Sequence, residues 1–220
     1  GDWLASLYDQ PAFGEVGDMD WHLEEEAVDF VKDLLGLPED FEGIFASGAT
    51  MATAAALAVA REWAAREQGK TADDGLYGIK PPEICSGLAH GSTYKALSII
   101  GVGRNNLRAL PLLPGRESVD VSALEEFLSA HKDEKCIVVA NMGTSGGGDI
   151  DDLAAIAALK DRYDFFLHVD GAIGAVICAS PKYRKLFDGM ERADSFTVDC
   201  HKWLNIPYDS AVVFVKKEHR

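Results

Sequence analysis

The chain has 220 residues, which is enough for one domain that buries roughly 70% of the surface of its extended chain. A formal charge of −15 at pH 7 argues against nucleic acid or an anionic membrane as a partner and is typical of a soluble protein. No apolar run approaches the length of a membrane-spanning helix, and Gly1–Trp3 lacks the features of a signal peptide.

We therefore expect a cytoplasmic protein. The missing initiator Met indicates a processed chain or a piece of a longer one. The four cysteines are widely spaced and form no CxxC pair, so we expect reduced, partly buried thiols and no disulfide framework; they are Cys85, Cys136, Cys178 and Cys200.

Helical and strand-like patterns alternate along the chain. In chain order we predict a helix at 22–36, a short strand or turn at 43–46, an Ala-rich helix from 47–50 to about 68, a surface loop at 69–82, a strand at 83–86, a helix from the turn at 89–92 to about 100, a strand at 107–113, a helix at 122–131, a strand at 136–141, a helix at 151–163, and strands at 165–170, 195–199 and 211–216. Ser122–Glu125 has the spacing of a capping box and is expected to begin its helix.

The strands are mostly continuous apolar runs, which indicates an α/β fold with a mostly parallel sheet covered by helices on both faces. In such sheets, ligands bind beyond the carboxyl ends of the strands. The polar candidates all follow strands and should meet at that edge; they are Ser47–Thr50, His90, Gly143–Gly148, Asp170 and Asp199–Lys202.

A lysine and an aspartate are the most informative of these candidates. Lys202 follows an apolar strand between the rings of His201 and Trp203, a setting that predicts a desolvated, neutral amine. Asp170 ends another apolar strand, where its carboxylate needs a cationic or hydrogen-bonding partner. Pyridoxal phosphate (PLP) requires such a pair, the lysine for a Schiff base and the aspartate for the protonated pyridine nitrogen. Taken singly, an ordinary strand-end lysine and a turn or N-cap acid are the more common interpretations.

The remaining candidates are weaker when taken alone. Ser47–Thr50 opens a helix, and its amides and hydroxyl make either a phosphate cup or a plain N-cap. Gly143–Gly148 is small enough to approach a ligand closely. His90 is either a ring-stacking residue or a structural histidine, and His201 is placed to hold a phosphate or a substrate carboxylate. We interpret three further histidines as surface residues: His22, His131 and His219.

Nearly the whole chain resembles the group II PLP-dependent amino-acid decarboxylases. The resemblance is carried by Leu167–Ala172 and by Ala193–Ser210, which includes the His-Lys-Trp segment. It implies the type I PLP fold, meaning an aspartate-aminotransferase-like large domain, together with PLP as cofactor, an amino acid as substrate, and a homodimer.

Carried over by position, the resemblance implies Lys202 as the Schiff-base lysine, Asp170 as the partner of the pyridine nitrogen, and His90 as a residue stacked on the ring. The other implied cofactor-binding residues are Ala49, Thr50, Ser145, Ala172, Asp199 and His201. No metal site is expected.

The chain departs from the family pattern in three ways. Met51 stands where the phosphate cup usually has a glutamate, and Cys200 stands where Pro or Ala is usual. An N-terminal helical segment, a catalytic loop and a small C-terminal domain are also absent, so residues 1–220 are expected to be a single large domain of a longer enzyme. Two alternatives remain open, namely another type I PLP enzyme (a carbon–carbon lyase or an aldehyde-forming relative) and a truncated, non-catalytic PLP-binding domain.

Overall fold

The computed structural model describes residues 19–71, 73 and 75–219, so the prediction about Gly1–Trp3 lies outside the described residues. The helices are α2 (Met19–Leu35), α3 (Ala49–Arg66), α4 (Gly91–Ile99), α5 (Val121–Ala130), α6 (Leu153–Ala158) and α7 (Cys200–Trp203). The strands are β1 (Phe41–Ala46), β2 (Glu83–Ser86), β3 (Leu107–Ala109), β4 (Cys136–Asn141), β5 (Phe165–Asp170), β6 (Ser195–Asp199) and β7 (Ala211–Lys216).

All seven strands form one sheet in the order β1-β7-β6-β5-β4-β2-β3. Every neighbouring pair is parallel except the two that involve β7, which runs against β6 and β1. The predicted mostly parallel α/β sheet is therefore confirmed. Because six strands share one direction, their carboxyl ends lie at the same edge of the sheet.

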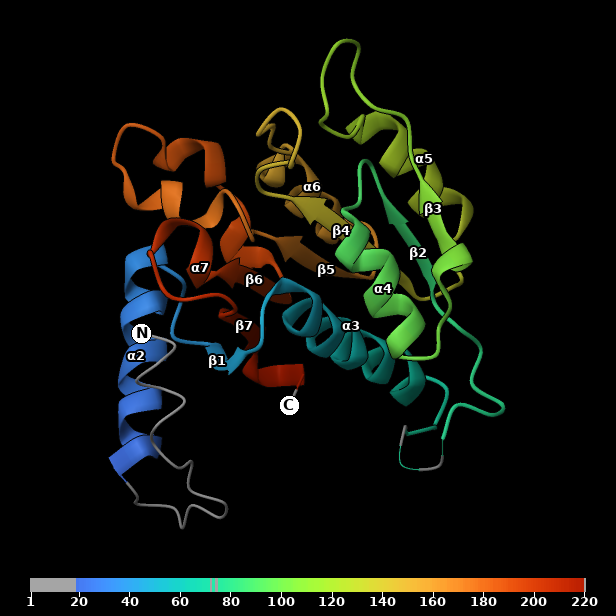
Figure 1. The fold of residues 1–220 in the computed structure, drawn as a ribbon. Helices are drawn as coiled ribbons and strands as arrows, with labels where there is room; N and C mark the ends of the chain where they lie inside the picture. Colours follow the sequence, from blue (N-terminus) through green and yellow to red (C-terminus); the bar gives the residue numbers. More distant parts are fainter. Residues whose placement is uncertain (1–18, 72, 74, 220) are drawn as a thin grey trace.

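Helices cover both faces of this sheet, as predicted (Figure 1). On one face, α3 and α4 lie side by side and bury Leu57, Leu97 and the β4 side chain of Ile137. The other face carries the larger core, where α2, α5 and α6 pack on strand residues that include Phe165 and Phe196. β5 supplies both cores because its side chains alternate across the sheet.

Several element boundaries differ from the predictions, and three of the differences have a clear local cause. The capping box predicted to begin at Ser122 was wrong. Asp120 caps α5 instead, by accepting a hydrogen bond from the Ser122 N–H at 2.9 Å. The strand predicted at 107–113 ends at Ala109, before Pro111. The helix predicted at 151–163 is α6 followed by the 3-10 turn Leu159–Asp161, with Asp152 as its N-cap.

All four cysteines are buried and free, as expected for reduced thiols. No helix among the described residues combines the length and apolar character that crossing a membrane requires.

Candidate active site

A cavity of about 660 Å³ lies at the carboxyl edge of the sheet. All nine predicted site residues line it: Ala49, Thr50, His90, Ser145, Asp170, Ala172, Asp199, His201 and Lys202. They follow the ends of β1, β2, β4, β5 and β6, which explains why residues up to 153 positions apart in the sequence meet here. The structure thus brings the predicted site together, while the role of each residue stays a prediction.

Lys202 lies in α7, the single helical turn that follows β6. Its Nζ is 2.8 Å from Oδ2 of Asp199, the last residue of β6. The Asp199 side chain is 2% exposed, whereas that of Lys202 is 32% exposed. The expectation of a desolvated lysine between two rings was wrong. Trp203 is 57% exposed, and the His201 ring packs on Tyr208 at 4.5 Å, so an ion pair rather than ring burial defines the setting of Lys202.

Asp170 ends β5 and is buried beneath the cavity. Its Oδ1 accepts a hydrogen bond from the Ala172 N–H at 3.1 Å, the bond of a turn acid. Burial raises the pKa of Asp170, opposed by that hydrogen bond and by the positive charge of Lys202 and of His90 when protonated. The carboxylate is therefore poorly compensated and would be stabilised by a cationic hydrogen-bond donor placed in the cavity.

His168 lies two residues before Asp170, on the same face of β5. It is fully buried, and its Nδ1 is 2.8 Å from Oγ of Ser195, the residue in register with it on β6. Burial lowers the pKa of His168 to about 3, so the ring is neutral at pH 7. A neutral imidazole beneath Asp170 adds no charge to the floor of the site.

The N-terminus of α3 forms one wall of the cavity. Gly48 occupies the N-cap position with φ 82°, a conformation that glycine adopts without strain, and no side chain caps the helix. The first turn carries no acidic residue. Uncapped amides at the positive end of a helix form a site suited to an anion such as phosphate.

The two histidines of the site are both anchored by hydrogen bonds. His90 is the N-cap of α4, where its Nδ1 accepts from the Ser92 N–H at 3.2 Å, so it has the structural role and still lines the cavity. His201 Nδ1 accepts from the Ser210 N–H at 3.0 Å. That bond leaves His201 Nε2 3.6 Å from Asp199.

Several cavity residues were missed by the sequence interpretation: Glu117, Asn141, Tyr208 and Asp209. Glu117 accepts hydrogen bonds from Thr144 Oγ1 and from the Gly147 N–H, the latter at 2.8 Å, and so fixes the glycine-rich loop. A single glutamate in a polar loop gives no signal in the sequence. Tyr208 and Asp209 follow the His-Lys-Trp segment, and that adjacency was the one signal available for them.

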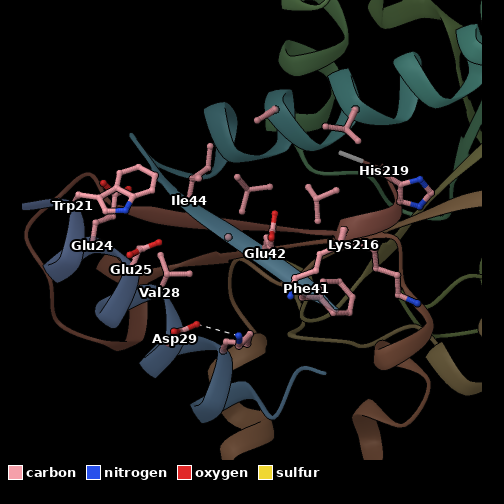
Figure 2. Close-up of a pocket in the computed structure, with 17 residues that line it drawn as sticks. Trp21, Glu24, Glu25, Val28, Asp29, Phe41, Glu42, Ile44, Lys216 and His219 are labelled. Carbon is pink, nitrogen blue, oxygen red and sulfur yellow. Dashed lines mark ion pairs between the residues drawn. The ribbon is translucent and has the colours of Figure 1, made fainter. Parts of the chain in front are cut away.

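A second hollow, of about 700 Å³, lies between α2, β1 and β7 (Figure 2). Trp21, Val28 and Ile44 line it, and none of the predicted site residues does.

His219 also borders this hollow, and its interpretation as a surface residue was wrong. Its side chain is 10% exposed, and Nε2 lies 3.0 Å from Asp194 Oδ1. Asp194 also pairs with Lys160 and accepts from the Leu167 N–H at 2.6 Å, so this cluster ties the end of the described chain to β5.

Comparison with known proteins places the site in a family context. The family model for the pyridoxal-dependent decarboxylase conserved domain matches residues 10–220. The chain is 33% identical over 198 residues to an aromatic-L-amino-acid decarboxylase of Bacillus atrophaeus, an alignment that covers 88% of this chain and 39% of the relative. It is 31% identical over 206 residues to a phenylacetaldehyde synthase of Arabidopsis thaliana, covering 89% and 41%.

The fold agrees with these relatives. The crystal structure of Oryza sativa TDC with PLP superimposes with a TM-score of 0.86 at 26% identity, covering 100% of this chain and 49% of that one. The chain spans about two-fifths of the length of the two curated relatives, the Bacillus atrophaeus and Arabidopsis thaliana proteins.

Proposed function

This chain belongs to the pyridoxal-dependent decarboxylase family, and we propose that it is the cofactor-binding part of an enzyme that decarboxylates an L-amino acid, with PLP held as a Schiff base on Lys202. The observation that carries the proposal is one cavity that brings together a lysine amine, a buried carboxylate that forms no ion pair with the described residues, and a helix N-terminus without a side-chain cap. These three groups are complementary to the aldehyde, the pyridinium N–H and the phosphate of PLP.

When bound, PLP supplies an electron sink that accepts the electron pair left on the substrate as carbon dioxide departs. The task of Asp170 is to hold a proton on the pyridine nitrogen. Its burial makes an unpaired negative charge unfavourable, so a pyridinium N–H is the partner that best compensates it. Ala172, two residues on, is small and buried, which would leave room for a flat ring beside it.

The phosphate and the ring are positioned by other residues of the cavity. We propose that Ala49 and Thr50 hold the phosphate through the first turn of α3, with His201 and Ser145 as additional polar contacts. We propose that His90, whose orientation is set by its bond to the Ser92 N–H, would stack on the cofactor ring.

A second candidate function is favoured by one comparison. The phenylacetaldehyde synthase relative is nearly as similar as the aromatic-L-amino-acid decarboxylase, so an aldehyde-forming reaction on the same lysine is the runner-up. The two reactions are distinguished by their organic product, because decarboxylation gives an amine. As the family resemblance implies, we also propose that the working enzyme is a homodimer, which size-exclusion chromatography with light scattering tests.

The decisive experiment maps the cofactor linkage. The protein is loaded with PLP, reduced with borohydride, digested and analysed by mass spectrometry. We expect the pyridoxyl group on Lys202. An adduct on Lys95 or Lys216, or no adduct at all on a folded chain, would overturn the proposal. Amine and carbon dioxide release from a panel of aromatic, acidic and basic L-amino acids then identifies the substrate class.

A further inference from the structure

Asp199 is built into the cavity in a way that helix capping does not explain. It occupies the N-cap position of α7, yet its side chain makes no capping hydrogen bond. Instead, the carboxylate faces the cavity and places Oδ2 2.8 Å from Lys202 Nζ. Oδ1 is buried and has no hydrogen-bond partner among the described residues. A 2% exposed carboxylate with one free oxygen is a costly arrangement for structure alone.

The ion pair has a chemical consequence for Lys202. An ammonium group cannot attack an aldehyde, because its nitrogen has no free electron pair, and so the proton on Nζ must leave before a Schiff base can form. Among the acidic residues that line the cavity, Asp199 is the one in contact with Nζ, and Asp170 already faces the ring position. A carboxylate at hydrogen-bond distance is well placed to take that proton.

We propose that Asp199 is the general acid–base residue for covalent loading of the cofactor onto Lys202, an inference that rests on the proposed function. Asp199 takes one proton from the ammonium group, and the free amine adds to the PLP aldehyde carbon while its second proton moves to the former aldehyde oxygen. Protonated Asp199 then gives its proton to that hydroxyl group, which leaves as water as the carbon–nitrogen double bond forms. The positive charge ends on the imine nitrogen, and Asp199 is again a carboxylate beside it.

A purely electrostatic role for Asp199 would change the rate of PLP loading in the opposite direction. If the carboxylate serves only as a charge partner, it holds Lys202 in the unreactive ammonium form, and removing it should speed loading. If it transfers the proton, removing it should slow loading. General acid–base groups typically contribute about 10²–10⁴-fold to a rate, so the expected slowing is large enough to measure.

The test follows the rise of imine absorbance after cofactor-free protein is mixed with PLP in a stopped-flow instrument. We expect Asp199→Asn to slow this phase by roughly tenfold or more, while borohydride mapping still finds the adduct on Lys202. Asp33→Asn is the matched control, because it makes the same change to an exposed carboxylate that does not line the cavity, and we expect it not to slow loading. We expect added formate to restore part of the rate of Asp199→Ala, because the small acid can replace the missing carboxyl group.

Circular dichroism of each variant checks that a slow phase does not come from misfolding. Loading of folded Asp199→Asn at the parental rate or faster would overturn the inference while leaving the proposed function intact. Absence of any imine on Lys202 in the parent protein would instead defeat the proposed function itself.

Discussion

The neutral His168 should make the stability of the folded chain depend on pH in a way that one substitution removes. Burial lowers the pKa of His168 to about 3, whereas an exposed histidine in the unfolded chain titrates near 6.5. Because the unfolded state binds the proton first, the stabilising contribution is complete above pH 6.5 and is lost as the pH falls toward 3. The slope is about 1.4 kcal/mol per pH unit, so roughly 2 kcal/mol disappears between pH 6.5 and pH 5.

His168→Asn tests this reasoning. The Asn amide can keep a hydrogen bond to Ser195 Oγ, and it does not titrate. Any packing cost of the substitution is the same at every pH, so the difference in unfolding free energy between parent and variant should shrink by about 2 kcal/mol from pH 6.5 to pH 5. Urea unfolding followed by tryptophan fluorescence measures it.

The control is His22→Asn, because His22 is exposed on α2 and pairs there with the exposed Glu25. The same measurement on this variant shows how much of any change comes from losing a histidine side chain as such rather than the buried one. A His168→Asn difference that also stays constant would refute the argument, since it would mean that His168 is protonated equally in the folded and unfolded states.

Three further predictions concern the frame of the site. Gly174→Ala should lower the unfolding free energy by about 1–3 kcal/mol, because a Cβ there would lie 2.1 Å from the Met142 carbonyl oxygen. Gly91→Ala is the control and should not lower the unfolding free energy, because its Cβ would meet nothing within 4 Å. Glu117→Gln should speed amide exchange at Gly147 and weaken PLP binding, because the carboxylate holds the glycine-rich loop, whereas the exposed Glu126→Gln should do neither. The four buried thiols should react with a thiol reagent only as the chain unfolds, and in the native state burial also raises the pKa of Cys136 to about 12, so that little reactive thiolate forms there. Prompt labelling of native protein would contradict this.

The sequence was most informative where local pattern and burial agree. The strands at 136–141, 165–170, 195–199 and 211–216 have the predicted bounds, because each lies in the buried part of the sheet and consists largely of apolar and β-branched residues. Asp170 and Lys202 could be found because each stands at the end of such a run. Since β5 and β6 are parallel neighbours, both residues necessarily reach the same edge.

The features that were missed depend on contacts between distant residues. Two good capping residues, Asp120 and Ser122, stand two positions apart, and only the approach of the chain decides which one caps α5. His219 is held by Asp194, which lies 25 residues away in the sequence, so the residues next to His219 could not predict this partner. The Lys202 side chain was expected to be shielded by its neighbours, but the turn of α7 points Trp203 toward solvent and leaves Asp199 as the contact.

Asp170 and Asp151 offer a final contrast between two buried carboxylates. Burial raises the pKa of both. Asp151, however, accepts hydrogen bonds from the Val119 and Asn141 N–H groups, each at 2.7 Å, and so joins two loops to the sheet. Among the described residues, Asp170 accepts one hydrogen bond, from the Ala172 N–H, and it otherwise faces the cavity. The first carboxylate serves the fold, and the second costs the fold stability until a ligand compensates its charge.

The two Asn variants should therefore have opposite effects on the cofactor-free chain. The pKa of Asp170 is higher in the folded chain than in the unfolded chain, so the stability of the parent falls as the pH rises from the unfolded-state pKa to the folded-state pKa. Asp170→Asn removes the charge that causes this loss and should therefore raise the melting temperature at pH 7. The same variant should lose most of the melting-temperature gain that PLP gives the parent, because its amide carries no charge to hold the pyridine proton. Asp151→Asn should lower the melting temperature. The new amide has one oxygen acceptor where the carboxylate has two, so either the Val119 or the Asn141 N–H group would lose its acceptor. If Asp170→Asn destabilised the cofactor-free chain as Asp151→Asn does, Asp170 would be a structural acid, and its assignment to the cofactor would lose its physical basis.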